Sequence, residues 1–172
     1  MGTDRLIGRE GELAQLGDRL ASTTAGVGNI VLIEGPAGIG KSRLLDELVR
    51  MASASRFVVA AARSDELDQV TPLGPLLAAL ATSSRPVLTG DDFDALRLGH
   101  QRMWILDRLG GILEAEARHH PVLISIDDVQ WADGSTLQAL APLPGRLFWL
   151  PVPWVLARRS DPQGPVMASW AG

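Results

Sequence analysis

The stretch Gly35-Pro36-Ala37-Gly38-Ile39-Gly40-Lys41-Ser42 constrains the fold most, because it matches the spacing G-x-x-x-x-G-K-[ST]. Gly35 and Gly40 allow backbone angles and a close approach to phosphate that a Cβ would forbid. The backbone N–H groups of such a loop, at the start of a helix, surround phosphate oxygens. We expect Lys41 to reach the β- and γ-phosphate oxygens and the Ser42 hydroxyl to bind Mg²⁺. The stretch therefore predicts a phosphate-binding loop for a nucleotide.

The residues on either side supply the strand and the helix that such a loop requires. Residues 29–34 are an apolar, β-branched run of strand length, and leucine and valine repeat at helical spacing over residues 44–49. The chain has fifteen arginines and a single lysine, which is Lys41. A compact ammonium fits beneath a phosphate where a flat guanidinium fits badly. The alternative is a glycine-rich turn with an incidental Lys-Ser, and this context argues against it.

A second motif, residues 121–128, ends an apolar strand with the carboxylates of Asp127 and Asp128. In an open α/β sheet, ligands bind at the carboxyl ends of the strands. We assign Asp127 to Mg²⁺, held through its waters, and Asp128 to orienting the attacking water. A strand that ends in an Asp-rich turn is common. This motif therefore indicates a nucleotide site strongly only in combination with the phosphate loop. Because aspartate is one methylene shorter than glutamate, we expect Asp128 to support slow hydrolysis, which suits a switch more than a motor.

The rest of the chain alternates predicted helices and strands, which is typical of an α/β domain with parallel strands. Further strands are predicted over residues 56–62 and 154–157. Asp133 is predicted to cap a short helix over residues 134–140. Residues 83–94 receive no assignment, and residues 142–153, with four prolines, are predicted to be largely loop. Helices are predicted over residues 12–21, 72–81 and 96–118, the last with a buried face of Leu98, Ile105, Leu109, Ile112 and Leu113.

Length and composition fit one globular domain over residues 1–172. The net charge is −4 with scattered acidic residues, so no basic face indicates nucleic acid. Cysteine is absent, which excludes disulfides and thiolate metal sites. The sequence shows no signal-peptide layout, and no apolar run approaches the ~20 residues that span a bilayer. A cytoplasmic protein without membrane contact is the expectation.

With these motifs in place, the chain resembles the N-terminal ATPase domain of the STAND and AAA+ type. That domain heads the large ATP-binding transcriptional regulators of the LuxR family in actinobacteria. The resemblance covers nearly the whole chain, and its most specific part is the extension of the second motif through Trp131-Ala132-Asp133. The residues that carry it are 6–10, 35–42, 122–133 and 155–159.

The resemblance implies a P-loop NTPase fold: three α/β/α layers around a mostly parallel sheet of order 5-1-4-3-2, with the fifth strand missing here. It places Lys41 and Ser42 in Walker A roles and Asp127 and Asp128 in Walker B roles. It places Arg159, in preference to Arg158, at the sensor position for the γ-phosphate. An equally supported interpretation is that both arginines are solvated surface charges. The expected nucleotide contacts are Gly35, Pro36, Ala37, Gly38, Ile39, Gly40, Lys41, Ser42, Arg43 and, near the adenine, Arg9.

Regulators of this family are much longer, with a lid, a winged-helix segment and a helix-turn-helix that residues after Arg159 cannot hold. We therefore expect a single ATPase domain, incomplete at its C-terminus, that makes no direct contact with nucleic acid. In the implied strand order the first strand lacks its outer neighbour, which leaves a hydrophobic edge prone to self-association.

Three functions remain in competition at this point. The first is a switch that binds Mg·ATP and hydrolyses it slowly with Lys41, Asp128 and Arg159. The second is a binding module that holds ATP or ADP without useful turnover, because the domain is incomplete. The third is a phosphotransferase, for which the sequence offers no evident acceptor site or basic lid.

Overall fold

The structure is a computed structural model that describes residues 8–23, 26–98 and 101–160, and the side chains of residues 97 and 98 are not described. The predicted contributions of Leu6, Ile7 and Leu98 therefore lie outside what is described, as does the stretch 161–172. None of the helices in the described ranges is long and apolar enough to cross a membrane.

Four parallel strands form the centre of the molecule in the order β1-β4-β3-β2. Their sequences are continuous apolar runs, as expected for parallel strands covered on both faces. The order 1-4-3-2 and the α/β class agree with the prediction. The strands are β1 Ile30–Gly35, β2 Val58–Arg63, β3 Val122–Asp127 and β4 Trp154–Arg159.

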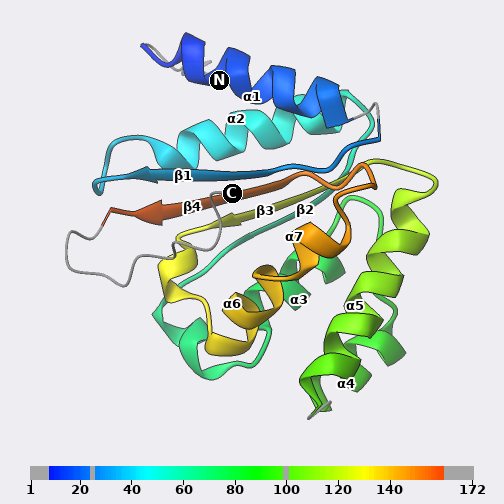
Figure 1. Cartoon of the computed structure of the whole chain (residues 1–172). Coiled ribbons are helices and arrows are strands. Elements are labelled where there is room, and N and C mark those ends of the chain that lie inside the picture. Colours follow the sequence, from blue (N-terminus) through cyan, green and yellow to red (C-terminus); the bar gives the residue numbers. More distant parts are fainter. Residues whose placement is uncertain (1–7, 24–25, 99–100, 161–172) are drawn as a thin grey trace.

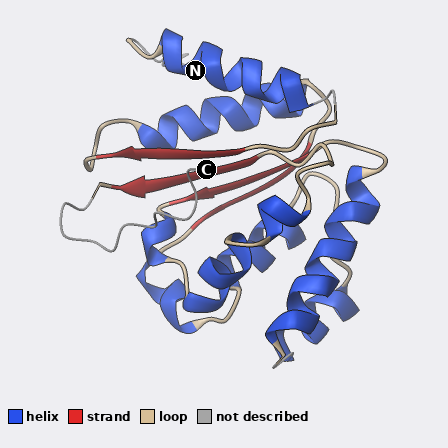
Figure 2. Cartoon of the chain, in the orientation of Figure 1, coloured by secondary structure: helices blue, strands red, loops and turns tan. Residues whose placement is uncertain are grey.

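Helices cover the two faces of the sheet, which gives the three expected layers (Figures 1 and 2). One face carries α2 (Lys41–Ala54), which packs on the sheet, and α1 (Glu10–Thr23), which packs on α2. The opposite face carries α3 Gly74–Ala81, α4 Gly90–Leu98, α5 Arg102–Ala117, α6 Gly134–Leu140 and α7 Leu143–Arg146.

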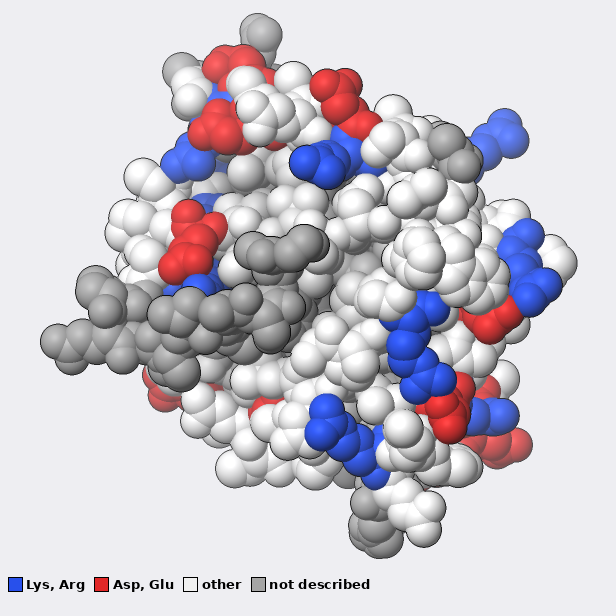
Figure 3. Space-filling view, viewed as in Figure 1, with Lys and Arg blue, Asp and Glu red and all other residues white. Residues whose placement is uncertain are grey.

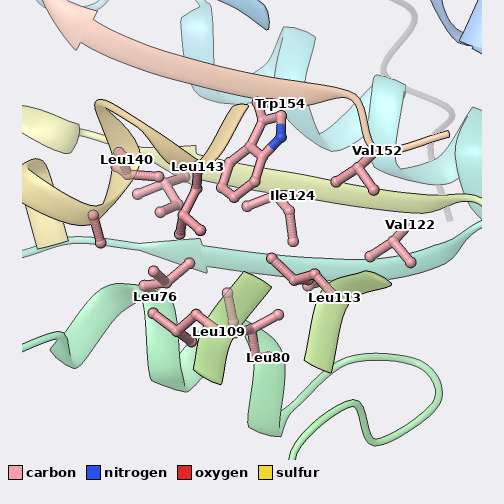
Figure 4. Packing of buried hydrophobic residues seen from close by; sticks show 14 of the residues in the cluster. Leu76, Leu80, Leu109, Leu113, Val122, Ile124, Leu140, Leu143, Val152 and Trp154 are labelled. Atoms are coloured by element: carbon pink, nitrogen blue, oxygen red, sulfur yellow. The ribbon is translucent and has the colours of Figure 1, made fainter. Parts of the chain in front are cut away.

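Alternation along β3 divides the core into two clusters. Val122, Ile124 and Ile126 point to the face of α3 and α5, and Leu123 points to the face of α1 and α2. Trp154 of β4 joins the first cluster and is 1% exposed (Figure 4). Every residue of β3 is buried, which explains why its sequence is apolar except for Ser125 until it ends in Asp127.

The single helix predicted over residues 96–118 is wrong. α4 ends at Leu98, and α5 begins at Arg102 after Gln101, an N-cap residue in extended conformation. The buried residues of α5 include Leu109 and Leu113 as predicted, together with Leu106, whereas Ile105 and Ile112 are only partly buried. The buried face of α5 is therefore centred on Leu106, Leu109 and Leu113.

Two smaller differences concern helix starts. α4 begins inside the stretch left unassigned, where the Thr89 hydroxyl accepts from the Asp92 N–H at 3.2 Å and the Thr89 N–H donates back to Asp92 at 3.4 Å. α7 lies inside the predicted loop 142–153, with a proline in its first turn. Proline is tolerated there because the first helical N–H groups have no intrahelical partner.

Candidate functional site

The parallel register brings the carboxyl ends of all four strands to one edge of the sheet. Gly35 of β1 pairs with Arg159 of β4, and Arg63 of β2 pairs with Asp127 of β3. The phosphate loop connects β1 to α2 at this edge, so both sequence motifs meet there. β2 is the edge strand on the far side of β3, so Arg63 approaches the site from that side.

The loop adopts backbone angles that its glycines permit. Gly38 has φ +76° and Gly40 has φ +96°, and Gly40 is the left-handed N-cap of α2. A Cβ added at Gly35 would come within 3.2 Å of Ile39 Cγ2, which is tighter than ordinary side-chain contact. The sequence therefore places glycine where the turn into α2 needs either a left-handed angle or close packing.

Lys41 is the first residue of α2 and is only 6% exposed. Its ammonium donates to the carbonyl oxygens of Gly35 at 2.9 Å and Pro36 at 3.0 Å. Those bonds hold the single lysine of the chain against the strand-to-helix loop. These carbonyl partners offset the cost of burying the ammonium.

A cavity of about 290 Å³ lies between the loop and the ends of β3 and β4. All of its lining residues belong to the predicted set. They are Ala37, Gly38, Gly40, Lys41, Ser42, Arg43, Asp128 and Arg159. The structure thus brings the loop lysine, the serine hydroxyl, one carboxylate and one guanidinium around a single space.

Asp127 does not line this cavity. It is 6% exposed, and its Oδ2 accepts from Arg63 Nε at 3.0 Å and from an Arg63 terminal nitrogen at 2.6 Å. Its Oδ1 accepts from the Asp128 N–H at 2.8 Å. Hydrogen bonding to Asp127 raises the pKa of the Arg63 guanidinium above its ordinary value, and the charges of Asp127, Asp128 and Asp46 add to the rise against the opposing effect of burial.

The two arginines at the end of β4 differ in their partners. Arg158 donates to Glu34 Oε2 at 3.0 and 3.3 Å, which ties it to the neighbouring strand. Arg159 lines the cavity, and its Nε lies 3.9 Å from Asp128 Oδ1. The geometry therefore favours Arg159 over Arg158 for contact with a ligand.

Two other predicted residues lie beside the motifs. Arg9 donates to the Ile39 carbonyl at 3.0 Å, so the start of α1 touches the phosphate loop. Asp133 caps α6 as predicted, accepting from the N–H groups of Ser135 and Thr136. It also accepts from the Leu73 N–H at 3.0 Å and thereby joins the turn after β3 to α3.

Sequence reasoning gave no role to Arg63 and Gln130. Arg63 could have been found from its place at the end of a parallel strand, but the partner it contacts depends on the strand register. Gln130 stands within the second motif, and its amide hydrogen-bonds both to Asp128 and to the Arg159 backbone N–H. Only the folded turn after β3 reveals those two contacts.

Comparison with known proteins decides the family. The profile of the AAA ATPase domain matches residues 5–153, most of the chain. The chain belongs to the AAA ATPase domain family. Domains of this family bind and hydrolyse ATP, typically with Mg²⁺.

Solved structures show the same AAA+ type of fold at low sequence identity. A structure of Drosophila ORC bound to DNA has a TM-score of 0.61 at 18% identity, over 91% of this chain and 38% of that chain. A structure of C. elegans PCH-2 has a TM-score of 0.50 at 12% identity, over 91% of this chain and 38% of that one. At these identities the likeness concerns the fold alone.

A curated relative is similar along nearly all of this sequence. An uncharacterized protein of Rhizobium meliloti is 28% identical over 195 aligned residues, which cover 90% of this chain and 18% of that protein. The AAA ATPase domain described here therefore spans less than a fifth of that relative.

The residues at the cavity fit a nucleoside triphosphate with Mg²⁺. Left-handed Gly38 and Gly40 leave the loop backbone uncovered by Cβ atoms, with nothing within 4 Å of where a Cβ would stand. Lys41 and Arg159 provide positive charge, and the Ser42 hydroxyl and the Asp128 carboxylate are hard oxygen donors of the kind Mg²⁺ prefers. Asp127 lies outside this lining, with its Oδ2 hydrogen-bonded to Arg63.

Proposed function

We propose that this AAA ATPase domain acts as a nucleotide switch that binds Mg·ATP at the phosphate loop and hydrolyses it slowly. The observation that carries the proposal is the cavity where the loop, Asp128 and Arg159 meet. Each wall supplies a different requirement of phosphoryl transfer: a backbone cradle, a cation, a water-orienting carboxylate and a second cation for the terminal phosphate.

Binding is assigned to the loop and its neighbours. The backbone N–H groups of residues 37–43 would surround the phosphates at the N-terminus of α2, where the helix dipole adds positive potential. Lys41 would exchange its two carbonyl partners for phosphate oxygens, and the Ser42 hydroxyl would hold the metal ion. Arg9, tied to the loop at Ile39, would lie beside the adenine.

Turnover is assigned to the residues on the opposite wall. Asp128 would orient the attacking water, and Arg159 would neutralise charge on the terminal phosphate. Bound Mg²⁺ supplies charge neutralisation and a template for the phosphates. Asp128 has φ +51°, an uncommon left-handed conformation for a residue other than glycine. Strained backbone of this kind is concentrated at functional sites.

A second candidate, nucleotide binding without useful turnover, is favoured by one contact. Arg63 holds Asp127 through two hydrogen bonds to the same oxygen, on the side of β3 away from the loop cavity. A second cavity, of about 260 Å³, lies there and is lined by both residues. If that bond persists with nucleotide bound, the proposed metal ligand stays occupied and the domain holds ATP without hydrolysing it.

Single-turnover hydrolysis with Asp128→Asn separates these candidates. We expect phosphate release from prebound ATP to slow about 10²-fold or more in the variant, because water activation by a positioned side chain contributes that much. Nucleotide affinity should persist. Asp107→Asn, an exposed aspartate of α5, is the matched control and should release phosphate normally. Unchanged release in Asp128→Asn would refute the water-orienting role, whereas tight binding with no release in the natural chain would select the second candidate.

We further propose that the domain belongs to a longer signal-responsive regulator of the LuxR type. The support is the extended second motif through Asp133 and the much greater length of the Rhizobium relative. Contact with DNA would fall to other segments. On the face seen in Figure 3, basic and acidic side chains of the described residues are interspersed, which gives little attraction for a polyanion.

Self-association through β1 is a separate part of the proposal. β1 pairs only with β4 among the strands in the described ranges, so its outer edge presents backbone N–H and C=O groups. Ile30, Val31, Leu32 and Ile33 are only partly buried at this edge. Such an edge is a template for pairing with another strand.

A further inference from the structure

The Gln130 side chain bridges two residues of the candidate site. It lies in the short 3₁₀ helix η2 (Val129–Trp131) that follows β3. Its Nε2 donates to Asp128 Oδ1 at 2.8 Å, and its Oε1 accepts from the Arg159 N–H at 3.1 Å. Because a backbone N–H only donates and a carboxylate only accepts, one orientation of the amide satisfies both contacts. Gln130 thus joins the turn after β3 to the end of β4.

Asp128 Oδ1, which accepts a hydrogen bond from Gln130, is also close to the Arg159 guanidinium. Arg159 Nε lies 3.9 Å from Asp128 Oδ1, beyond hydrogen-bond distance. The neighbouring Arg158 shows the alternative, since two of its nitrogens lie 3.0 and 3.3 Å from Glu34. At one strand end, therefore, one arginine is bound to a carboxylate and the next is held away from one.

We infer that Gln130 is a positioning residue that prevents a close ion pair between Asp128 and Arg159. By supplying a neutral donor to Oδ1, it satisfies the carboxylate and leaves the Arg159 guanidinium available to the cavity that both residues line. Arg63 Nε also lies 3.9 Å from Asp128, at Oδ2, and this guanidinium is hydrogen-bonded to Asp127. If the Gln130 side chain is removed, the Arg159 guanidinium can take its place as the donor to Asp128 Oδ1.

The consequence concerns which nucleotide is preferred, and it rests on the proposed function, in which Arg159 contacts the terminal phosphate. ATP carries a phosphate that ADP lacks, so an available Arg159 favours ATP. When Gln130 is lost, Asp128 captures the guanidinium and the preference for ATP declines. The affinity for ADP, which depends on the loop, changes little.

Calorimetric titration with Mg²⁺ and either ADP or a non-hydrolysable ATP analogue measures this preference without turnover. We expect Gln130→Leu to lower the ratio of analogue affinity to ADP affinity by about tenfold, the weight of one charge-assisted hydrogen bond. Gln130→Glu keeps the shape and the bond to Arg159 but cannot donate to Asp128, so the ratio should fall as well. Gln138→Leu, the same change at an exposed position of α6, is the matched control and should keep the ratio of the natural chain.

A second substitution tests the cause. In Gln130→Leu with Asp128→Asn, the neutral amide cannot hold Arg159 as an ion pair, so the ratio should recover. An unchanged ratio in both Gln130 variants overturns the inference, as does a lowered ratio that Asp128→Asn fails to restore. An equal loss of affinity for both nucleotides would indicate a merely structural role and would also overturn it. Failure of the proposed function looks different, because the natural chain would then bind neither nucleotide.

Discussion

At the scale of single residues, the phosphate loop depends on backbone angles that only glycine adopts cheaply. Gly40 has φ +96° and open space around the position of a Cβ, so Gly40→Ala introduces backbone strain without a steric clash. Gly111 lies exposed in the middle of α5, also with open space and without a left-handed angle. The same substitution at the two glycines should therefore change stability in opposite directions.

We expect Gly40→Ala to lower the free energy of unfolding by about 1–2 kcal/mol, the cost of a left-handed angle for alanine. Gly111→Ala should raise it by about 0.5–1 kcal/mol, the difference in helix propensity. Urea denaturation of both variants and the natural chain measures these changes. If Gly40→Ala were neutral or stabilising, the left-handed turn described at the N-cap of α2 would be wrong.

Site residues could be predicted from the sequence where a motif fixes both their type and their spacing. All eight residues that line the loop cavity were among those predicted, because the loop and the strand–carboxylate motif are local patterns. Arg63 and Gln130 were missed for a physical reason. The partner of Arg63 is set by the pairing of β2 with β3, and the contact between Gln130 and Arg159 by the packing of the turn after β3 against β4, neither of which a local pattern encodes.

At the scale of elements, α4 and α5 are held together by a buried aspartate. Asp92 is 8% exposed; the Thr89 hydroxyl donates to it at 2.6 Å, and Arg108 of α5 forms an ion pair with it. The hydrogen bond from Thr89 and, after it, the Arg108 guanidinium hold the pKa of Asp92 below its ordinary value, against the opposing effect of burial. The charged form therefore stabilises the folded state.

This tie predicts a pH dependence with a definite sign. Because the folded pKa is lowered, the contribution is complete above the unfolded aspartate pKa of about 3.9 and is lost as the pH falls through the folded value. The stability advantage of the natural chain over Asp92→Asn should thus be constant near neutral pH and shrink below about pH 4. Urea denaturation across that range measures it. Asp91→Asn, an exposed aspartate in the same turn, is the control, and a pH response as large as that of Asp92→Asn would contradict the tie.

Helices and strands were predicted correctly where the apolar pattern is continuous, and wrongly where a helix is interrupted or short. The four strands were found because buried parallel strands are continuous apolar runs between turn residues. One helix was predicted over residues 96–118, where the structure has α4 and α5, because apolar residues at helical spacing occur on both sides of the interruption. α7 was missed because four prolines indicate loop more strongly than they indicate a short helix that begins with one.

At the scale of the whole molecule, the exposed edge of β1 predicts association. Sedimentation velocity over a range of protein concentrations should show an average sedimentation coefficient that rises with concentration, because strand edges pair by mass action. A coefficient that stays at the monomer value at every concentration would contradict the proposed self-association. It would leave the nucleotide site unaffected, since that site is built within one chain.

The central claim is that this AAA ATPase domain binds Mg·ATP through its phosphate loop, and Lys41 tests it most directly. Calorimetric titration of the natural chain with a non-hydrolysable ATP analogue and Mg²⁺ should show one site per chain. Lys41→Ala should weaken that binding at least about tenfold, the weight of a charge-assisted contact to phosphate. Arg50→Ala, which removes one positive charge from an exposed position of α2, should bind as the natural chain does. With the folded state of each variant verified by circular dichroism, undiminished binding by Lys41→Ala would contradict the account.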